Sequence, residues 1–251
     1  GYIRDNMGFS NEAIDDALTK SLHRLKTDYI DLYQLHWPER IANFFGKRNY
    51  KHNFDEKWED NFKEVIEKLN SLVKEGKIRH YGVSNETPWG LMRHLNESSK
   101  HNLTRCKTIQ NPYSLLNRTF EVGLSEISMR EKVGLLAYSP MAFGRLSGKF
   151  LNGKMPKNSR INLFPQFSRY NSEQSIFLTE KYAELAKKLN ISLAQLSLAF
   201  VNQQPFVTSN IIGATSMEQL KENISSIQVE LSVETFEEID KIQELQPNPA
   251  P

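Results

Sequence analysis

Hydrophobic and polar positions follow two spacings that alternate along the chain. In residues 11–25 the apolar side chains stand at positions 14, 17, 18, 22 and 25, the spacing of one helix face. Ser10 or Asn11 precedes this face and suits a helix N-cap. Residues 29–35 are mostly apolar and are typical of a short buried strand. The pattern therefore predicts a helix followed by a strand.

The same alternation continues to the end of the chain, with two long interruptions at 38–57 and 141–171 that predict loops. Thr87 and Pro88 begin one helix with an N-cap and a first-turn proline. The tail 246–251 is expected to be extended or loose. Strands are predicted at 78–83, 107–110, 133–138 and 206–213, and helices at 58–76, 87–100, 118–132, 172–189, 192–203, 216–227 and 233–245.

Strands that alternate with helices indicate an α/β fold with a parallel sheet covered by helices. This pattern alone does not separate an open, doubly wound sheet from a (β/α)₈ barrel. The first strand is not followed by G-x-G-x-x-G, which weakens the dinucleotide-binding Rossmann interpretation. No linker divides the chain, so we expect one domain over residues 1–251.

Composition and charge narrow the classes of function. The chain has 251 residues, 39% hydrophobic and 25% charged, with a net charge of +2, which gives no argument for nucleic-acid or membrane-surface binding. No apolar run approaches the ~18 residues of a membrane span, and the first residues lack the apolar segment of a signal peptide. Cys106 is the only cysteine, which excludes an internal disulfide and a cysteine-built metal site. We expect a cytoplasmic protein without a metal.

Polar and aromatic residues follow each predicted strand, at the strand ends where α/β proteins place their working residues. Polar residues often end strands for no functional reason, but five such sets on one face favour a ligand site. The five sets are His36-Trp37, Ser84-Asn85, Gln110-Asn111, Tyr138-Ser139 and Gly213-Ala214-Thr215.

Five sequence blocks resemble the successive signatures of the aldo-keto reductase superfamily. They are similar to its Tas-like bacterial branch and, more distantly, to the potassium-channel β subunits. The resemblance implies a (β/α)₈ barrel that binds an extended nicotinamide dinucleotide, usually NADP(H), and reduces a small aldehyde or ketone. The blocks are LKTDYIDLYQLHWPE, KIRHYGVSNET, TIQNPYSLLNR, LLAYSPMAFGRLSGKF and IIGATSMEQLKENI.

The resemblance assigns roles near the nicotinamide. His36 matches the active-site histidine, which can hydrogen-bond and orient a substrate carbonyl, and Trp37 would line the substrate pocket. Ser84, Asn85 and Gln110 match the residues that hold the carboxamide, which needs both donors and acceptors. The alternative for His36 is a core histidine whose hydrogen bonds are satisfied within the protein, and the alternative for Trp37 is an indole that only packs against its neighbours.

The resemblance also assigns residues to the rest of the cofactor. Tyr138 would stack on the nicotinamide ring. The loop after it would present backbone N–H groups and positive charge to the pyrophosphate, and the turn before helix 216–227 would meet the 2′-phosphate and adenine. Many family members carry Lys and Arg where this chain has Gly213 and Gln219, a departure that bears on the choice of NADP over NAD and leaves dinucleotide binding itself unaffected. The assigned residues are Ser139, Pro140, Met141, Gly144, Leu146, Lys149, Arg160, Gly213, Thr215, Gln219, Glu222 and Asn223.

Three catalytic residues of the family have no match in this sequence. The resemblance places Gly1 just after the third barrel strand, so we expect strands 1–3, and with them the catalytic Asp, Tyr and Lys, to be missing, leaving strands 4–8. On this basis the chain represents an NADP(H)-dependent reductase whose own activity is open, or a non-catalytic NADP(H)-binding sensor or regulatory subunit. Substrate and oligomeric state are not readable from the sequence.

Overall fold

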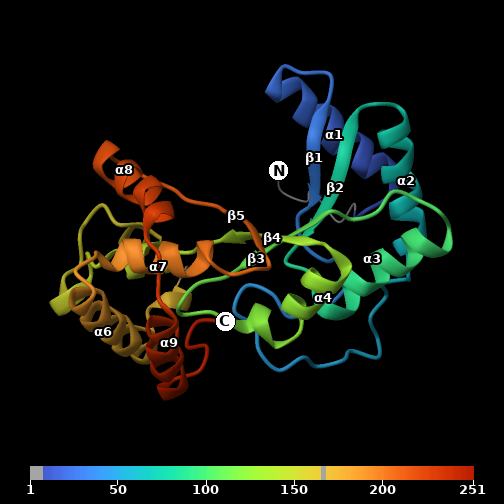
Figure 1. Ribbon diagram of the computed structural model, residues 1–251. Helices are drawn as coiled ribbons and strands as arrows, with labels where there is room; N and C mark the ends of the chain where they lie inside the picture. The colour runs from blue at the N-terminus through green and yellow to red at the C-terminus, as the bar shows by residue number, and fades with distance from the viewer. Residues whose placement is uncertain (1–7, 165–167) are drawn as a thin grey trace. The chain divides into compact units, whose positions relative to one another are not determined.

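The computed structural model describes residues 8–164 and 168–251 (Figure 1). The described residues form two compact units. The first comprises 8–44, 49–110 and 130–133, and the second comprises 45–48, 111–129, 134–164 and 168–251. The expectation of one barrel domain over residues 1–251 is not tested by this division and stays a prediction.

The first unit holds parallel strands. β1 (Ile30–Leu35) pairs in parallel with β2 (Ile78–Ser84), and β2 pairs in parallel with the first residues of β3 (Thr108–Pro112). Leu35 lies opposite Val83, and Ser84 opposite Gln110. Because the strands are parallel, their carboxyl ends meet at one edge, as the alternating pattern predicted.

Three helices accompany these strands: α1 (Asn11–Leu25), α2 (Phe62–Lys74) and α3 (Pro88–Lys100). The hydroxyl of Ser10 caps α1 by accepting from the N–H of Ala13 at 3.2 Å, and Thr87 caps α3 in the same way. The two predicted caps are confirmed. Figure 1 shows α2 along β2, and α2 also contacts α3.

The interpretation of 29–35 as a buried strand is wrong for most of its residues. Of β1, only Leu35 is buried, and Tyr29 just before it is 38% exposed. Among the described strands, β1 pairs with β2 alone, at the edge of the sheet. An edge strand has one neighbour, so its side chains keep part of their exposure.

The second unit contains the parallel pair β4 (Gly134–Tyr138) and β5 (Val207–Asn210), with Ala137 opposite Asn210. Together the two units show an α/β fold. The helices that begin in this unit are α4 (Leu124–Glu131), α5 (Arg160–Leu163), α6 (Glu173–Lys188), α7 (Leu193–Asn202), α8 (Met217–Ser225) and α9 (Val233–Leu245), with short 3₁₀ segments at Thr119–Val122, Ala142–Ser147, Leu151–Gly153, Ser168–Tyr170 and Ser226–Gln228.

Helix α7 is the core of the second unit. It contacts α6, α8 and β5, and Leu196, Leu198 and Phe200 have no exposed area. Residues 193–201 are apolar except for Gln195 and Ser197, and a helix that is apolar on most of its sides is stable only where neighbours cover them. The capping box formed by Ser192 and Gln195 fixes where it begins.

Two predictions in this unit are corrected. The helix predicted at 118–132 is divided into Thr119–Val122 and α4, because Gly123 takes a non-helical conformation between them. The tail is not loose: Ala250 is 1% exposed and donates its N–H to the carbonyl of Leu116 at 3.1 Å.

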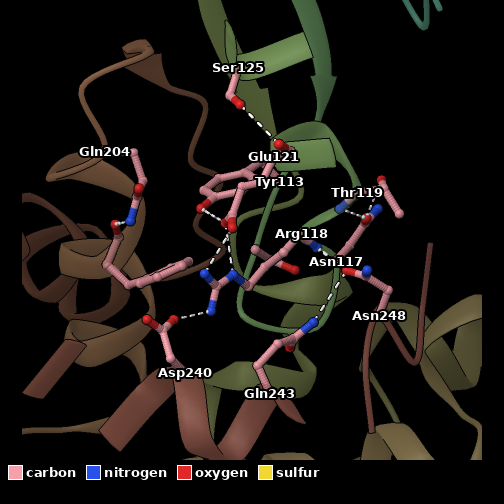
Figure 2. A network of polar contacts seen from close by, with 12 residues as sticks. Tyr113, Asn117, Arg118, Thr119, Glu121, Ser125, Gln204, Asp240, Gln243 and Asn248 are labelled. Atoms are coloured by element: carbon pink, nitrogen blue, oxygen red, sulfur yellow. Dashed lines mark hydrogen bonds and ion pairs between the residues drawn. The ribbon is translucent and has the colours of Figure 1, made fainter. Parts of the chain in front are cut away.

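A polar network holds the tail (Figure 2). Asn248 Oδ1 accepts from the backbone N–H of Arg118 at 2.6 Å, while the Arg118 guanidinium pairs with Glu121 at 2.7 and 2.8 Å and with Asp240 at 2.6 Å. The hydroxyl of Tyr113 donates to Glu121 at 2.5 Å. These bonds join residues up to 130 positions apart, which local sequence reasoning does not reach.

Candidate functional site

The structure brings together three predicted residues at the strand ends of the first unit. Ser84 is the last residue of β2, and its hydroxyl donates to the carbonyl of Gln110 at 2.8 Å. The backbone N–H of Asn85 donates to the same carbonyl at 2.9 Å. Parallel register places Ser84 opposite Gln110 and so makes both bonds possible.

Asn85 also reaches the predicted catalytic segment. Its side-chain amide donates to the carbonyl of His36 at 2.9 Å and to the hydroxyl of Ser84 at 3.1 Å. The Asn85 backbone is left-handed, with φ of 54°, a conformation that asparagine tolerates better than most residues. The amide therefore fixes the turn that carries His36 against the end of β2.

His36 and Trp37 are in mutual contact. Their ring centroids lie 4.2 Å apart with a tilt of 41°. His36 is exposed and Trp37 is half-buried, so His36 is not the enclosed core residue of the alternative interpretation. An exposed imidazole beside an indole is suited to meet a ligand, while the indole supplies apolar contact area.

Sequence reasoning missed Gln34. Its Oε1 accepts from the side-chain amide of Gln110 at 2.7 Å, and its own Nε2 is buried without a hydrogen-bond partner among the described residues. The sequence did contain a hint of this role. Gln34 is a polar residue in an otherwise mostly apolar strand and stands two positions before His36, and side chains two positions apart in a strand point to the same face.

This set fits a carboxamide ligand. A primary amide offers two N–H donors and one carbonyl acceptor, and the site offers amide and hydroxyl groups of both kinds. Within the described part of the chain, the buried Nε2 of Gln34 is a donor that lacks an acceptor, and a buried donor of this kind is normally satisfied by a hydrogen-bond partner. The residues present therefore fit the nicotinamide end of a dinucleotide.

In the second unit, β4 ends at Tyr138 and leads into a strained turn. Burial raises the pKa of Tyr138 to about 12, so its hydroxyl stays protonated. Ser139 has φ of 55°, Pro140 is buried, and Met141 is half-buried. The carbonyl of Ser139 accepts from Ala142 N–H at 2.9 Å, which closes the turn.

The prediction that Gly144 and Leu146 present free N–H groups is wrong. The carbonyl of Met141 accepts from Gly144 N–H at 2.8 Å and from Leu146 N–H at 3.2 Å. Both N–H groups are therefore already hydrogen-bonded within the tight 3₁₀ turn at Ala142–Ser147. Leu146 is fully buried, so it serves the loop as a core residue.

Lys149 is the better candidate for an anion in this loop. A Cβ added at Gly144 would lie 2.9 Å from Lys149 Nζ, so the ammonium rests against the glycine backbone. Burial lowers the pKa of Lys149, and no described carboxylate forms an ion pair with it. Arg160 begins α5 and places its guanidinium 4.3 Å from the ring of Phe143.

The last predicted group gathers around the start of α8. Asn223 is buried and donates from Nδ2 to the carbonyl of Gly213 at 3.2 Å. Gln219 Oε1 accepts from the N–H and the hydroxyl of Thr215 at 3.0 and 3.1 Å. Glu222 lies between these positions and is half-buried. The structure thus pairs Gly213 with Asn223 and Thr215 with Gln219, four of the five residues predicted for this turn.

The ends of β4 and β5 lie at one edge of the second unit, because Ile211 N–H donates to the carbonyl of Ala137 at 2.8 Å. Among residues 8–164 and 168–251, no cluster of His, Cys, Asp and Glu has the makings of a metal site. Over the same ranges no helix has the length and apolar character needed to cross a bilayer.

The sequence of this chain is similar to a known protein family and to several known proteins. The model of the "Aldo/keto reductase family" matches residues 4–244. "Protein tas" of Escherichia coli is 48% identical over 99% of this chain and 72% of its own length. The "NADH-specific methylglyoxal reductase" of E. coli is 30% identical over 89% and 62%, and a "Putative voltage-gated potassium channel subunit beta" of Schizosaccharomyces pombe is 25% identical over 98% and 68%.

Proposed function

Because this chain belongs to the aldo/keto reductase family, we propose that it binds NADP(H) and reduces the carbonyl of a small aldehyde or ketone to an alcohol. The observation that carries this proposal is the buried Nε2 of Gln34, which has no partner among the described residues and belongs to an amide hydrogen-bonded to Gln110, whose backbone carbonyl accepts from Ser84 and Asn85. These amides and the Ser84 hydroxyl would hold the carboxamide of the nicotinamide.

The bound cofactor would supply the hydride that the carbonyl carbon accepts, and the solvent would supply the proton that the carbonyl oxygen takes up. His36 would donate a hydrogen bond to that oxygen and orient the substrate, since a positioned donor stabilises the charge that develops there. Asn85 holds the backbone of this histidine through the 2.9 Å bond to its carbonyl. Trp37 would exclude water from one side of the substrate.

The remaining contacts involve the face of the nicotinamide ring, the pyrophosphate and the adenosine end of the cofactor. In the proposal, Tyr138 stacks on the nicotinamide ring, and Lys149 and Arg160 neutralise the pyrophosphate. The turn built by Gly213, Thr215 and Asn223 would hold the adenosine and its 2′-phosphate. A half-buried lysine without a described ion-pair partner supports an anion there.

The choice between NADP and NAD depends on the residues around the 2′-phosphate. Gly213 and Gln219 stand where many members of the family have basic residues, and one relative is named as NADH-specific. We favour NADPH, with a measurement of both cofactors as the test. Fluorescence titration with NADPH and NADH gives both affinities, and a tighter complex with NADH would overturn this preference.

The catalytic proposal is tested by NADPH oxidation with a simple aromatic aldehyde. Replacement His36→Ala is expected to reduce turnover by about 10²-fold, the scale of a positioned polar group. His23→Ala, at an exposed position on α1, is the matched control and should leave turnover unchanged. Equal turnover by the wild-type and His36→Ala proteins would remove the assigned role.

A second function is that of a non-catalytic NADP(H)-binding sensor or regulatory subunit. One observation favours it: a relative is named as a putative voltage-gated potassium channel subunit beta. This alternative predicts that NADPH binds without being oxidised by any aldehyde offered. Steady oxidation of NADPH by the wild-type chain would exclude it.

The proposal includes a fold and a setting. The five strands would correspond to strands 4–8 of a (β/α)₈ barrel, in agreement with their order along the chain. A single cysteine agrees with a cytoplasmic protein that acts on small molecules.

A further inference from the structure

Arg40 and Glu86 form a buried ion pair that the family assignment leaves without a role. The guanidinium donates from Nη1 to Glu86 Oε1 at 2.7 Å and from Nη2 to Glu86 Oε2 at 2.8 Å. The two side chains are only 9% and 4% exposed. Both oxygens of the carboxylate are engaged, which is the strongest geometry available to this pair of residues.

The surroundings of the pair are built to hold it. The Arg40 guanidinium also donates to the hydroxyl of Thr87 at 3.0 Å and lies 4.8 Å from the ring of Trp89. The N–H of Thr87 donates to Glu86 Oε2 at 2.8 Å. At Gly90, an added Cβ would clash with both the carboxylate and the guanidinium, so α3 has a glycine where the pair lies.

The position of the pair is what suggests a function. Arg40 lies four residues after His36, and Glu86 lies one residue after Asn85. The Asn85 amide is bonded to the His36 carbonyl, so the same two segments are joined twice. A single hydrogen bond between two turns would let the segments rotate about it, whereas two separate contacts fix their relative orientation.

We propose that Arg40 and Glu86 are positioning residues that lock the His36 turn to the Ser84-Asn85 turn. They would set the substrate-orienting imidazole relative to the carboxamide-binding amides. A buried ion pair is weak evidence for a stabilising role, since apolar replacements are often as stable. The inference rests on the proposed function for its effect on the cofactor, but the lock itself is independent of any cofactor.

The test uses the full 251-residue chain and the neutral double variant Arg40→Met/Glu86→Gln, which leaves no uncompensated buried charge. NADPH carries the nicotinamide, whereas 2′,5′-ADP carries the adenosine end without it. We expect the dissociation constant of NADPH to rise about tenfold, the equivalent of one lost hydrogen bond, and that of 2′,5′-ADP to stay within twofold.

The control is another Arg–carboxylate pair of the first unit. Arg105 and Glu131 are joined at 2.5 Å but are both 37% exposed. The variant Arg105→Met/Glu131→Gln should change neither dissociation constant. If the Arg40/Glu86 double variant does not fold, Arg40→Lys is used instead. This variant keeps the positive charge but loses the bidentate hydrogen bonding, and the same selective loss of NADPH affinity is expected.

A second readout separates this inference from the proposed function. Hydrogen exchange of the Asn85 side-chain amide, followed by NMR without any cofactor, should be at least tenfold faster in the double variant than in the wild type. Unchanged exchange would overturn the proposal, as would equal losses of affinity for NADPH and 2′,5′-ADP. If neither compound binds the wild-type chain, the proposed function fails while the exchange measurement still decides the lock.

Discussion

The side-chain amide of Gln110 donates a 2.7 Å hydrogen bond to the side-chain carbonyl of Gln34. This bond sets the rotation of the Gln110 amide and leaves its oxygen as the group that can accept from a ligand. The amide nitrogen of Gln34, buried and without a described partner, adds a donor beside it. Together the two glutamines offer an acceptor for the N–H groups of a carboxamide and a donor for its carbonyl oxygen.

Replacing Gln34 by Met should weaken NADPH binding about tenfold, because the variant removes a hydrogen bond and releases the Gln110 amide at nearly constant volume. Fluorescence titration measures the change. Gln228→Met, at an exposed position, is the control. Full affinity in Gln34→Met would contradict the carboxamide assignment.

Lys149→Met should lower NADPH affinity about tenfold, since a hydrogen bond to a charged group contributes about 1.5 kcal/mol or more. The salt dependence of binding should decrease at the same time, because one charge contact is lost. Titrations at two salt concentrations test both effects. Lys157→Met removes an exposed lysine of the same loop, and an equal loss there would argue against a specific pyrophosphate contact.

His94 should make the fold sensitive to acid. Burial, with the nearby Arg40 and Arg93, lowers the pKa of His94 from 6.5 to about 3. The unfolded chain therefore binds this proton first, and the stability contributed by neutral His94 is complete above pH 6.5 and is lost as the pH falls toward 3. At pH 5 the loss is about 2 kcal/mol.

Urea unfolding at pH 7.5 and pH 5 measures this contribution. The variant His94→Gln keeps a polar side chain of similar size without a titrating group, so its free energy of unfolding should fall by about 2 kcal/mol less than that of the wild type between these pH values. His23→Gln, at an exposed position, should behave as the wild type. Parallel pH dependence of wild-type and His94→Gln proteins would show that His94 is not responsible.

Asn248 should stabilise the second unit by holding the tail. Its side-chain oxygen accepts from Arg118 N–H at 2.6 Å, and its carbonyl accepts from Arg48 at 2.7 Å. Asn248→Ala leaves the Arg118 N–H unpaired and should lower the free energy of unfolding by about 1–2 kcal/mol. Asn248→Asp keeps the acceptor and should lose less. Thermal and urea unfolding compare the two variants, and equal losses would assign the effect to the backbone instead.

Local elements were predictable because their signals are local. Ser10 and Thr87 cap helices through bonds to N–H groups three residues away, and a three-residue pattern is visible in any sequence. The residues at the strand ends, such as Ser84 and Tyr138, were also found in advance, since a strand ends where its apolar run ends.

Pairings between distant segments were not predictable in the same way. The Arg40–Glu86 pair spans 46 positions and the Gln34–Gln110 bond spans 76. The sequence contains many other polar residues that could have formed such pairs, and nothing in it singles out these partners. The failure at Gly144 and Leu146 has the same origin, because the Met141 carbonyl takes their N–H groups only in the folded turn.

The sequence by itself determined the order of strands and helices, where most of them begin and end, and which residues follow each strand, because periodicity and capping act over a few neighbouring residues. Only the tertiary structure decided that β1 stays half-exposed, that the tail is bound at Arg118, and that Asn85 holds the His36 turn. The physical reason is that burial and long-range hydrogen bonds depend on which segments the chain brings side by side, and that choice is made by the whole fold.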